Sequence, residues 1–328
     1  MKKVNLERGL APLYPHAAIH GLAALSKALG VHQTTLTKCA LDAERLYRVA
    51  KSETKSDGSI RQTYDAQPRL KAVQIKIKER LLQRVVFPLY LHGSLPGRSP
   101  RTNAETHIRA KITFAEDVSN FFPSASRALV HRVWADLFGF SQDVAALLTA
   151  LTTKDGGLPQ GAVSSSYLAN LAFWDYEPGL VKILNLRGLR YSRYVDDITV
   201  SSPLRLDPSE KTYVVGQIYG MLLHHGFQPK RSKHEITTAA KSMRTTKLVH
   251  HTRVSLPPAQ RKNTRAAVYA LERRVTSGER GPDVMKELAS VSTRVGRLGS
   301  FHKPQAKELK KRIDSVRSIL RELADPPG

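Results

Sequence analysis

Two adjacent aspartates, Asp196 and Asp197, interrupt a run of residues that otherwise favours β-structure. The flanking segments, 189–195 and 198–202, are rich in aromatic and β-branched side chains and predict two paired strands joined by a tight turn. Like charges held near a hydrophobic core destabilise a fold, unless a divalent cation neutralises them. The pattern therefore indicates either a cation site or an ordinary hairpin turn that faces solvent.

A third carboxylate favours the cation site. Asp117 lies at the end of a strand-like segment, 111–118, and an apolar turn at 120–124 follows it. An aspartate in this position is usually only a cap, but here it precedes Leu158-Pro159-Gln160-Gly161 and then the paired aspartates. Phosphoryl transfer uses hard oxygen ligands to hold two magnesium ions about 4 Å apart. Carboxylates from neighbouring strands of one sheet can supply those ligands.

The charge of the chain indicates its class of partner. Lys and Arg number 52 against 28 Asp and Glu, which gives a net charge of +24 in 328 residues. A polyanion such as nucleic acid would neutralise this excess, since phosphate contacts release counterions and drive binding. From Pro257 onwards there are 16 basic residues against 8 acidic ones. Charge alone leaves open a ribosome-associated protein or a merely soluble basic surface.

Composition excludes several other classes of protein. The single cysteine, Cys39, cannot form a disulfide within the chain or a zinc site made of cysteines. No run of about 18 apolar residues predicts a transmembrane helix, and Asn5, Glu7 and Arg8 interrupt what would be the apolar core of a signal peptide. We therefore expect a cytoplasmic protein without a membrane partner.

Hydrophobic periodicity predicts an α+β fold with a basic helical tail. The leucines of residues 17–50 recur at helical spacing, with a break at Gly30. The stretch from Leu25 to Leu36 resembles the start of a helix-turn-helix, although a helical cap on a larger enzyme fits better. The dipeptide Asp57-Gly58 predicts a hairpin turn within 55–61. The remaining predicted helices are residues 69–84, 164–184, 212–226 and three segments after Pro257, which are separated by breaks at 278–281 and 296–304.

The chain resembles the reverse transcriptases, and among them the retron type. EDVSNFFPS resembles the first aspartate motif of that family, GLPQGAVSSSYLANL its proline-glutamine-glycine motif, and RYVDDITVS its paired-aspartate motif. IRQTYDAQPRLKAVQIKI and HGFQPKRSKHEI resemble the fingers segment and the later lysine motif. The resemblance spans about residues 15–325. It implies a right-hand polymerase. The N-terminal helices and fingers are expected at 1–110, the palm at 111–255 and a basic helical thumb at 256–328. The palm is expected to consist of an antiparallel sheet and helices and to include interleaved fingers elements.

The resemblance also implies the roles of residues at the polymerase site. Asp117, Asp196 and Asp197 are the expected catalytic residues, which hold two Mg²⁺ ions with the Val118 carbonyl; Mn²⁺ is expected to substitute. Phe122 matches the aromatic residue that crowds the 2′ position and favours dNTPs, although it could also be a plain core phenylalanine. The expected nucleotide-binding residues are Arg61, Lys71, Phe122, Gln160, Gly161 and Lys233.

Two further segments are expected to contact RNA. HGSLPGRSPRTNAETHIRA resembles a retron-type segment in which Gly-Arg-Ser precedes Asn-Ala-x-x-His. Its Arg98, Asn103 and His107 could position RNA, or they could form a buried polar network that fixes the loop. In the thumb, three basic residues are expected to contact phosphates: Arg261, Lys262 and Arg265.

The implied function is RNA-directed DNA synthesis in antiphage defence. The expected template is a cognate structured non-coding RNA, which is copied into an RNA–DNA hybrid (msDNA) from dNTPs, and an effector protein is a possible further partner. The Val-Thr-Gly element usual in retron enzymes is missing from residues 246–253. Two alternatives are therefore kept: another bacterial defence-associated reverse transcriptase with a different template or priming mode, and a non-catalytic RNA-binding scaffold. The presence of all three aspartates argues against the scaffold.

Overall fold

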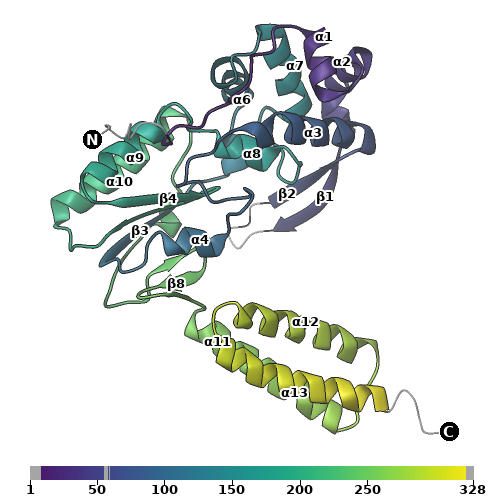
Figure 1. The fold of residues 1–328 in the computed structure, drawn as a ribbon, viewed down its shortest axis with the longest axis vertical. Coiled ribbons are helices and arrows are strands. Elements are labelled where there is room, and N and C mark those ends of the chain that lie inside the picture. Colours follow the sequence, from purple (N-terminus) through teal and green to yellow (C-terminus); the bar gives the residue numbers. More distant parts are fainter. Residues whose placement is uncertain (1–8, 55–57, 59, 323–328) are drawn as a thin grey trace.

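The computed structural model describes residues 9–54, 58 and 60–322, and a four-stranded antiparallel sheet lies at its centre (Figure 1). The strand order is β4-β5-β3-β6. These strands are β3 (Ile112–Asp117), β4 (Arg190–Tyr194), β5 (Asp197–Ser202) and β6 (Glu235–Thr238). β3 and β5 pair over their full lengths, from Ile112 opposite Ser202 to Asp117 opposite Asp197. The predicted strands and the predicted α+β class are confirmed.

Two helices, α9 (Glu177–Leu186) and α10 (Pro208–His224), pack against each other beside the sheet (Figure 1). α10 begins four residues before the predicted helix because Asp207 and Glu210 form a reciprocal capping box. The single helix predicted at 164–184 is wrong. The chain instead forms α8 (Ser165–Asn170), a turn and then α9, because Pro178 has no backbone N–H and suits the first turn of a new helix rather than a helix interior.

The part of the chain that precedes the sheet forms a long hairpin and several helices. The prediction of helix over 17–50 is correct only between Leu22 and Leu46, where helices follow one another. It is wrong before Leu22, and it is wrong from Tyr47 on because Tyr47 starts a strand that pairs with residues 60–66. The turn predicted at Asp57-Gly58 lies largely outside the described residues. The elements of this region are α1 (Leu22–Leu29), α2 (Gln33–Leu41), η1 (Ala43–Leu46), β1 (Tyr47–Thr54), β2 (Ile60–Ala66), α3 (Pro68–Arg80) and η2 (Leu82–Arg84).

Short helices connect these elements to the sheet. α7 packs on α1, α2 and α3, so this central part of the sequence extends the N-terminal layer. The connecting helices are α4 (Pro100–Glu105), α5 (Phe121–Ser124), α6 (Arg127–Arg132), the π-helical turn η3 (Val133–Leu137), α7 (Gln142–Thr152) and η4 (Arg231–Lys233).

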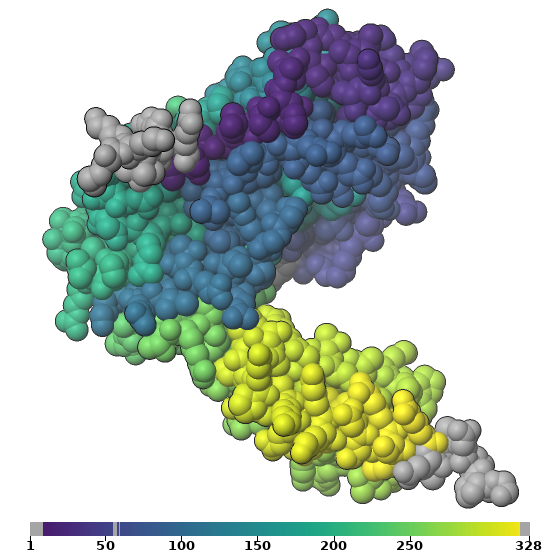
Figure 2. Space-filling view, viewed as in Figure 1, coloured from purple at the N-terminus to yellow at the C-terminus, as the bar shows by residue number. Residues whose placement is uncertain are grey.

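The C-terminal part is a three-helix bundle with its own hydrophobic core. It projects from the larger body, and Figure 2 shows a deep notch between the bundle and that body. A small sheet of β7 (Arg244–Thr245), β8 (Leu248–His250) and β9 (Val254–Ser255) connects the two parts. The helices are α11 (Pro258–Thr276), α12 (Pro282–Gly299) and α13 (Lys303–Glu322), so the prediction of three helices is confirmed. Within the described residues, none of the helices is both long enough and apolar enough to cross a membrane.

Candidate active site

The three predicted catalytic aspartates meet at one end of the central sheet. Asp117 ends β3 directly opposite Asp197, the first residue of β5. The backbone N–H of Val118 donates to the Asp196 carbonyl at 3.2 Å, which ties the turn between β4 and β5 to the end of β3. The fold therefore brings together carboxylates that are 79 and 80 positions apart in the sequence.

The turn that presents Asp196 and Asp197 has an unusual backbone. Val195 has φ of 60°, in the left-handed region that disfavours β-branched residues. The main chain at Gly93 lies against this turn, and a Cβ at Gly93 would be 2.3 Å from the Val195 Cγ2. Glycine is required at 93 because no other residue fits that close approach.

A buried arginine holds the same turn from the inside. Arg193 is fully buried and donates to the Val195 carbonyl at 3.0 Å and to the Asn170 carbonyl at 2.8 Å. Its charge is paired with Glu177, with Nε 2.6 Å from Oε1. Sequence reasoning missed Arg193, Glu177 and Gly93. Arg193 could have been noticed because it is a charged residue among the aromatic residues of a predicted strand. Nothing in the sequence distinguishes Gly93.

The negative charge at the site is incompletely compensated. Burial, followed by repulsion from Asp196 and Asp117, raises the pKa of Asp197 from 3.8 to about 7. Burial also raises the pKa of Asp196, and Asp117 adds to the effect, while Lys233 and Arg61 oppose it. The carboxylates therefore repel one another in a partly dehydrated environment. This is the electrostatic situation that a bound cation relieves.

Lys233 forms an ion pair with one of these carboxylates. Its Nζ lies 2.5 Å from the Asp117 Oδ2, and the backbone N–H of Lys230 donates to the Asp117 carbonyl at 2.7 Å. Burial lowers the pKa of Lys233, but the hydrogen bond to Asp117 and the charges of the three aspartates outweigh this effect and raise it.

The donor chemistry suits a hard divalent cation. Three carboxylates provide only oxygen ligands, as Mg²⁺ and Mn²⁺ prefer. Within residues 9–54, 58 and 60–322, no group of three or more His, Cys, Asp or Glu side chains is already arranged to hold a metal ion. The Lys233 ammonium is paired with one oxygen of Asp117. The residues fit the ion in chemistry, since each carboxylate has two oxygens and Lys233 engages only one of those of Asp117.

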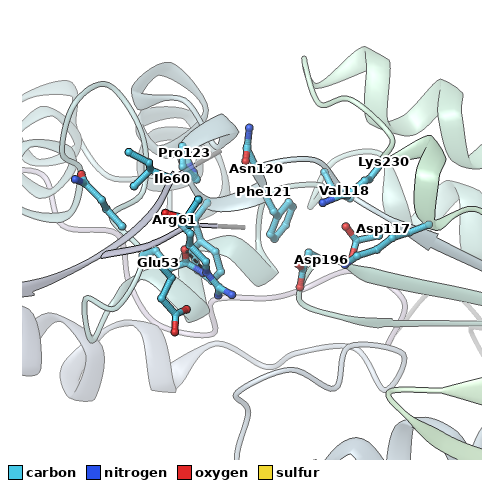
Figure 3. A pocket seen from close by; sticks show the side chains of 15 residues that line it. Glu53, Ile60, Arg61, Asp117, Val118, Asn120, Phe121, Pro123, Asp196 and Lys230 are labelled. Atoms are coloured by element: carbon cyan, nitrogen blue, oxygen red, sulfur yellow. Dashed lines mark hydrogen bonds and ion pairs between the residues drawn. The ribbon is translucent and has the colours of Figure 1, made fainter. Parts of the chain in front are cut away.

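A cleft of about 660 Å³ opens beside the aspartates, between the β1–β2 hairpin and the end of the sheet (Figure 3). Figure 3 shows Arg61 on one side of the cleft and Asp117 and Asp196 on the other. The Arg61 Nε donates to the Gln160 Oε1 at 3.0 Å. The predicted site residues that line the cleft are Arg61, Asp117, Val118, Phe122, Gln160, Asp196 and Lys233.

Three predicted residues are not among the described residues that line the cleft. Asp197 lies behind Asp196 at the start of β5. The ammonium of Lys71, which was predicted to contact the triphosphate, lies 2.8 Å from the Asp65 carboxylate. Lys71 therefore forms an ion pair that joins α3 to β2. Gly161 allows close backbone approach, as expected, but the neighbour is β2: its φ is 107°, and a Cβ there would be 2.7 Å from the Tyr64 carbonyl oxygen.

Burial argues against direct RNA contact by Asn103 and His107, whereas Arg98 is only partly buried and its role in RNA binding remains a prediction. The Arg98 guanidinium donates to the backbone carbonyls of Phe87, Pro88 and Leu91, which uses its hydrogen-bonding capacity inside the loop.

Asn103 and His107 are fully buried. The two ring nitrogens of His107 are each 2.7 Å from a serine hydroxyl, those of Ser192 and Ser201, so this histidine joins α4 to the central sheet. The burial of these two residues favours the alternative of a buried polar segment that fixes the loop, although only His107 is hydrogen-bonded: the side-chain amide of Asn103 is buried without a hydrogen-bond partner among the described residues.

The predicted thumb contacts lie on α11. Lys262 and Arg265 are exposed and Arg261 is partly buried. Their role in binding phosphates remains a prediction.

Comparison with known proteins points to one family. No protein-family model matches the sequence. The chain is 34% identical to the retron Se72 reverse transcriptase of Salmonella heidelberg over 262 residues, which cover 79% of this chain and 69% of that protein. It is 30% identical to the retron Ec48 reverse transcriptase of Escherichia coli over 323 residues, which cover 93% and 78% respectively. Among solved structures, telomerase from Candida albicans aligns with a TM-score of 0.43 and 11% identity, over 76% of this chain and 47% of the telomerase chain.

Proposed function

The chain belongs to the retron reverse transcriptases, which are RNA-directed DNA polymerases, and we propose that Asp117, Asp196 and Asp197 form its polymerase site. The observation that carries this proposal is the pairing of β3 with β5, which sets Asp117, a residue of the cleft wall, opposite Asp197. Two Mg²⁺ ions held there would stabilise the charge that develops on the attacking and leaving oxygens. Mn²⁺ would substitute, because it has the same preference for oxygen ligands.

We further propose that the cleft holds the incoming dNTP. Its volume is within the range of about 300–1,000 Å³ that is usual for ligand sites. Phe122 lies in the wall of the cleft and would crowd a 2′-hydroxyl, which favours deoxyribose. Arg61 and Lys233 provide positive charge on opposite sides of the cleft, where it can stabilise a triphosphate in the transition state. Gln160 would hold Arg61 in place through their hydrogen bond.

The layout of the chain supports a right-hand polymerase. In this proposal the β1–β2 hairpin and α1–α3 are the fingers (residues 1–110), the four-stranded sheet with α9 and α10 is the palm (111–255), and the bundle α11–α13 is the thumb (256–328). The packing of α7 on α1–α3 assigns this helix to the fingers although it lies within the palm range of the sequence. The notch between the bundle and the larger body would then hold the template–primer duplex (Figure 2).

The template that we propose is a structured non-coding RNA, which the enzyme copies into an RNA–DNA hybrid in antiphage defence. Membership of the family supports this template, and the net charge of +24 suits a protein that remains bound to nucleic acid. The Val-Thr-Gly element absent from 246–253 leaves the mode of RNA recognition as a separate question for experiment.

The test is to identify the nucleic acid that co-purifies with the protein after expression with its native flanking DNA. We expect one abundant small RNA–DNA hybrid in which ribonuclease shortens the RNA, and in which a debranching enzyme releases the DNA 5′ end. An Asp196→Asn variant should retain the RNA and lack the DNA. A DNA 5′ end linked to an amino acid, or only long unbranched DNA, would contradict the retron type while leaving the polymerase intact. DNA present equally in the Asp196→Asn variant would contradict the polymerase site.

A further inference from the structure

Two consecutive residues of β3 contact two consecutive residues, Lys233 at the end of η4 and His234 directly after it. The Asp117 Oδ2 lies 2.5 Å from the Lys233 Nζ, and the Glu116 Oε1 lies 2.5 Å from the His234 Nδ1. Successive side chains of a strand point to opposite faces of its sheet. The two pairs therefore hold the same short segment from both faces of β3, with Lys233 on the face of the catalytic carboxylate.

The contact between Glu116 and His234 lies outside the cleft, and only its carboxylate is buried. Glu116 is 2% exposed, and the Tyr219 hydroxyl from α10 approaches its second oxygen at 3.4 Å, whereas the His234 side chain is 32% exposed. Neither Glu116 nor His234 is among the described residues that line the cleft, so neither side chain is positioned to touch a substrate there. The imidazole therefore reaches a buried carboxylate from the surface, which ties residue 234 to β3.

η4 is flanked by two segments whose backbones pair with β3, one at Lys230 before it and one that begins at Glu235 after it. η4 is a single turn of three residues, Arg231–Lys233, and none of the three is buried. The segment before it is held by backbone pairing, through the Lys230 N–H and the bridge between Val118 and Pro229. After η4, His234 is the first residue whose side chain reaches the sheet. The Lys233 side chain itself is 54% exposed, and such a long side chain has many rotamers unless its backbone is fixed.

We propose that Glu116 and His234 are positioning residues, which fix η4 so that the Lys233 ammonium is presented to Asp117 and to the nucleotide in the cleft. This inference rests on the proposed function, because it assigns Lys233 to the nucleotide site. Loss of the pair lowers the efficiency of dNTP incorporation through Lys233 and leaves RNA binding unchanged.

The test is a double-mutant cycle with Lys233, measured as kcat and KM for single-nucleotide incorporation. His234→Phe removes the hydrogen bond at similar ring size, His234→Gln retains a donor, and Lys233→Met removes the ammonium. We expect His234→Phe to lower kcat/KM roughly tenfold, which corresponds to the loss of one charge-assisted contact. His234→Gln should recover most of that loss. In the Lys233→Met background, His234→Phe should cause no further loss.

A merely structural role gives a different result, because the losses from His234→Phe and Lys233→Met would then multiply. Multiplying losses overturn the proposal, and so does a His234→Phe enzyme with unchanged kcat/KM. His20→Phe, at an exposed position on the N-terminal side, is the matched control and should behave as wild type. If His234→Phe does not fold, Glu116→Gln replaces it in the same cycle, because it retains the shape of the side chain. Failure of the proposed function is recognised separately, since the wild type would then incorporate no dNTP at all.

Discussion

Gly93 lies directly against Val195, so that a Cβ at position 93 would be 2.3 Å from the valine Cγ2 and 2.7 Å from the valine backbone nitrogen. The turn that carries Asp196 and Asp197 is thus confined from outside by a glycine and from inside by Arg193, whose guanidinium donates to the Val195 carbonyl. The strained backbone at Val195 persists because its surroundings specify it.

This relationship predicts that Gly93→Ala displaces the turn that carries Asp196 and Asp197. Because the atoms in the way include backbone, which cannot rotate aside, we expect at least a tenfold loss of kcat and a lower melting temperature. The control is Gly179→Ala in α9, where a Cβ would meet nothing within 4 Å. That variant should keep its activity, and its free energy of unfolding should rise by about 0.5–1 kcal/mol, since alanine is the better helix former. Wild-type kcat in Gly93→Ala would show that the turn adapts.

The second prediction concerns how stability depends on pH without metal. The pKa of Asp197 is raised to about 7 in the folded state, whereas the pKa of an aspartate in an unfolded chain is about 3.9. Below pH 4 the carboxyl is neutral in both states, so the stability it contributes is fully present there and is lost as the pH rises through 7. Asp197→Asn stays neutral throughout. In EDTA at pH 8 we therefore expect this variant to be more stable than wild type, by on the order of 2 kcal/mol. Chemical denaturation at pH 4 and pH 8 measures the difference, and equal stability at pH 8 would contradict the raised pKa.

The third prediction concerns the choice of sugar. If Phe122 crowds the 2′ position, Phe122→Ala should raise the efficiency of ribonucleotide incorporation relative to dNTPs. The measurement is the ratio of kcat/KM for the two substrates. Phe138 is the control: it is buried, its ring packs on Trp134 and Phe140, and it is not among the described residues that line the cleft, so its loss should reduce stability without changing that ratio. An unchanged ratio in Phe122→Ala would make Phe122 a plain packing residue.

The fourth prediction concerns the C-terminal bundle. Neutralising Arg261, Lys262 and Arg265 on α11 should weaken RNA binding and reduce its dependence on salt, since each lost phosphate contact lowers the log–log slope by roughly 0.7–0.9. Neutralising Lys27 and Lys38, which are exposed on α1 and α2, should leave the slope unchanged. If affinity and slope both persist in the α11 variant, those charges only solvate the surface.

Local patterns in the sequence predicted those elements that local interactions determine. The strand ending at Asp117, the strands around Asp196-Asp197 and the three C-terminal helices all follow from hydrophobic periodicity and turn residues. The central carboxylates could be proposed as a site because they occur in order within motifs that resemble those of one family.

The misses depend on contacts between distant parts of the sequence. Tyr47 begins a strand because it pairs with Ala66, and the polar residues Asn103 and His107 are buried because α4 packs on β4 and β8. Glu116 and His234, 118 positions apart, carry no local sign that they meet. The sequence motifs thus indicated which segments contribute to the site. Only the packing of the folded chain distinguished the residues that line the cleft from those that stabilise the fold.

Primer extension by an Asp197→Asn variant tests the central claim most directly. The substrate is an RNA template with an annealed primer and dNTPs, and the reaction is followed with Mg²⁺ and with EDTA. We predict that the wild type extends the primer only with Mg²⁺, and that Asp197→Asn is inactive although it folds and binds RNA as the wild type does. Asp143→Asn, at an exposed position on α7, should remain fully active. Extension by Asp197→Asn at a rate near that of the wild type would contradict the assignment of the three aspartates as the metal-holding site.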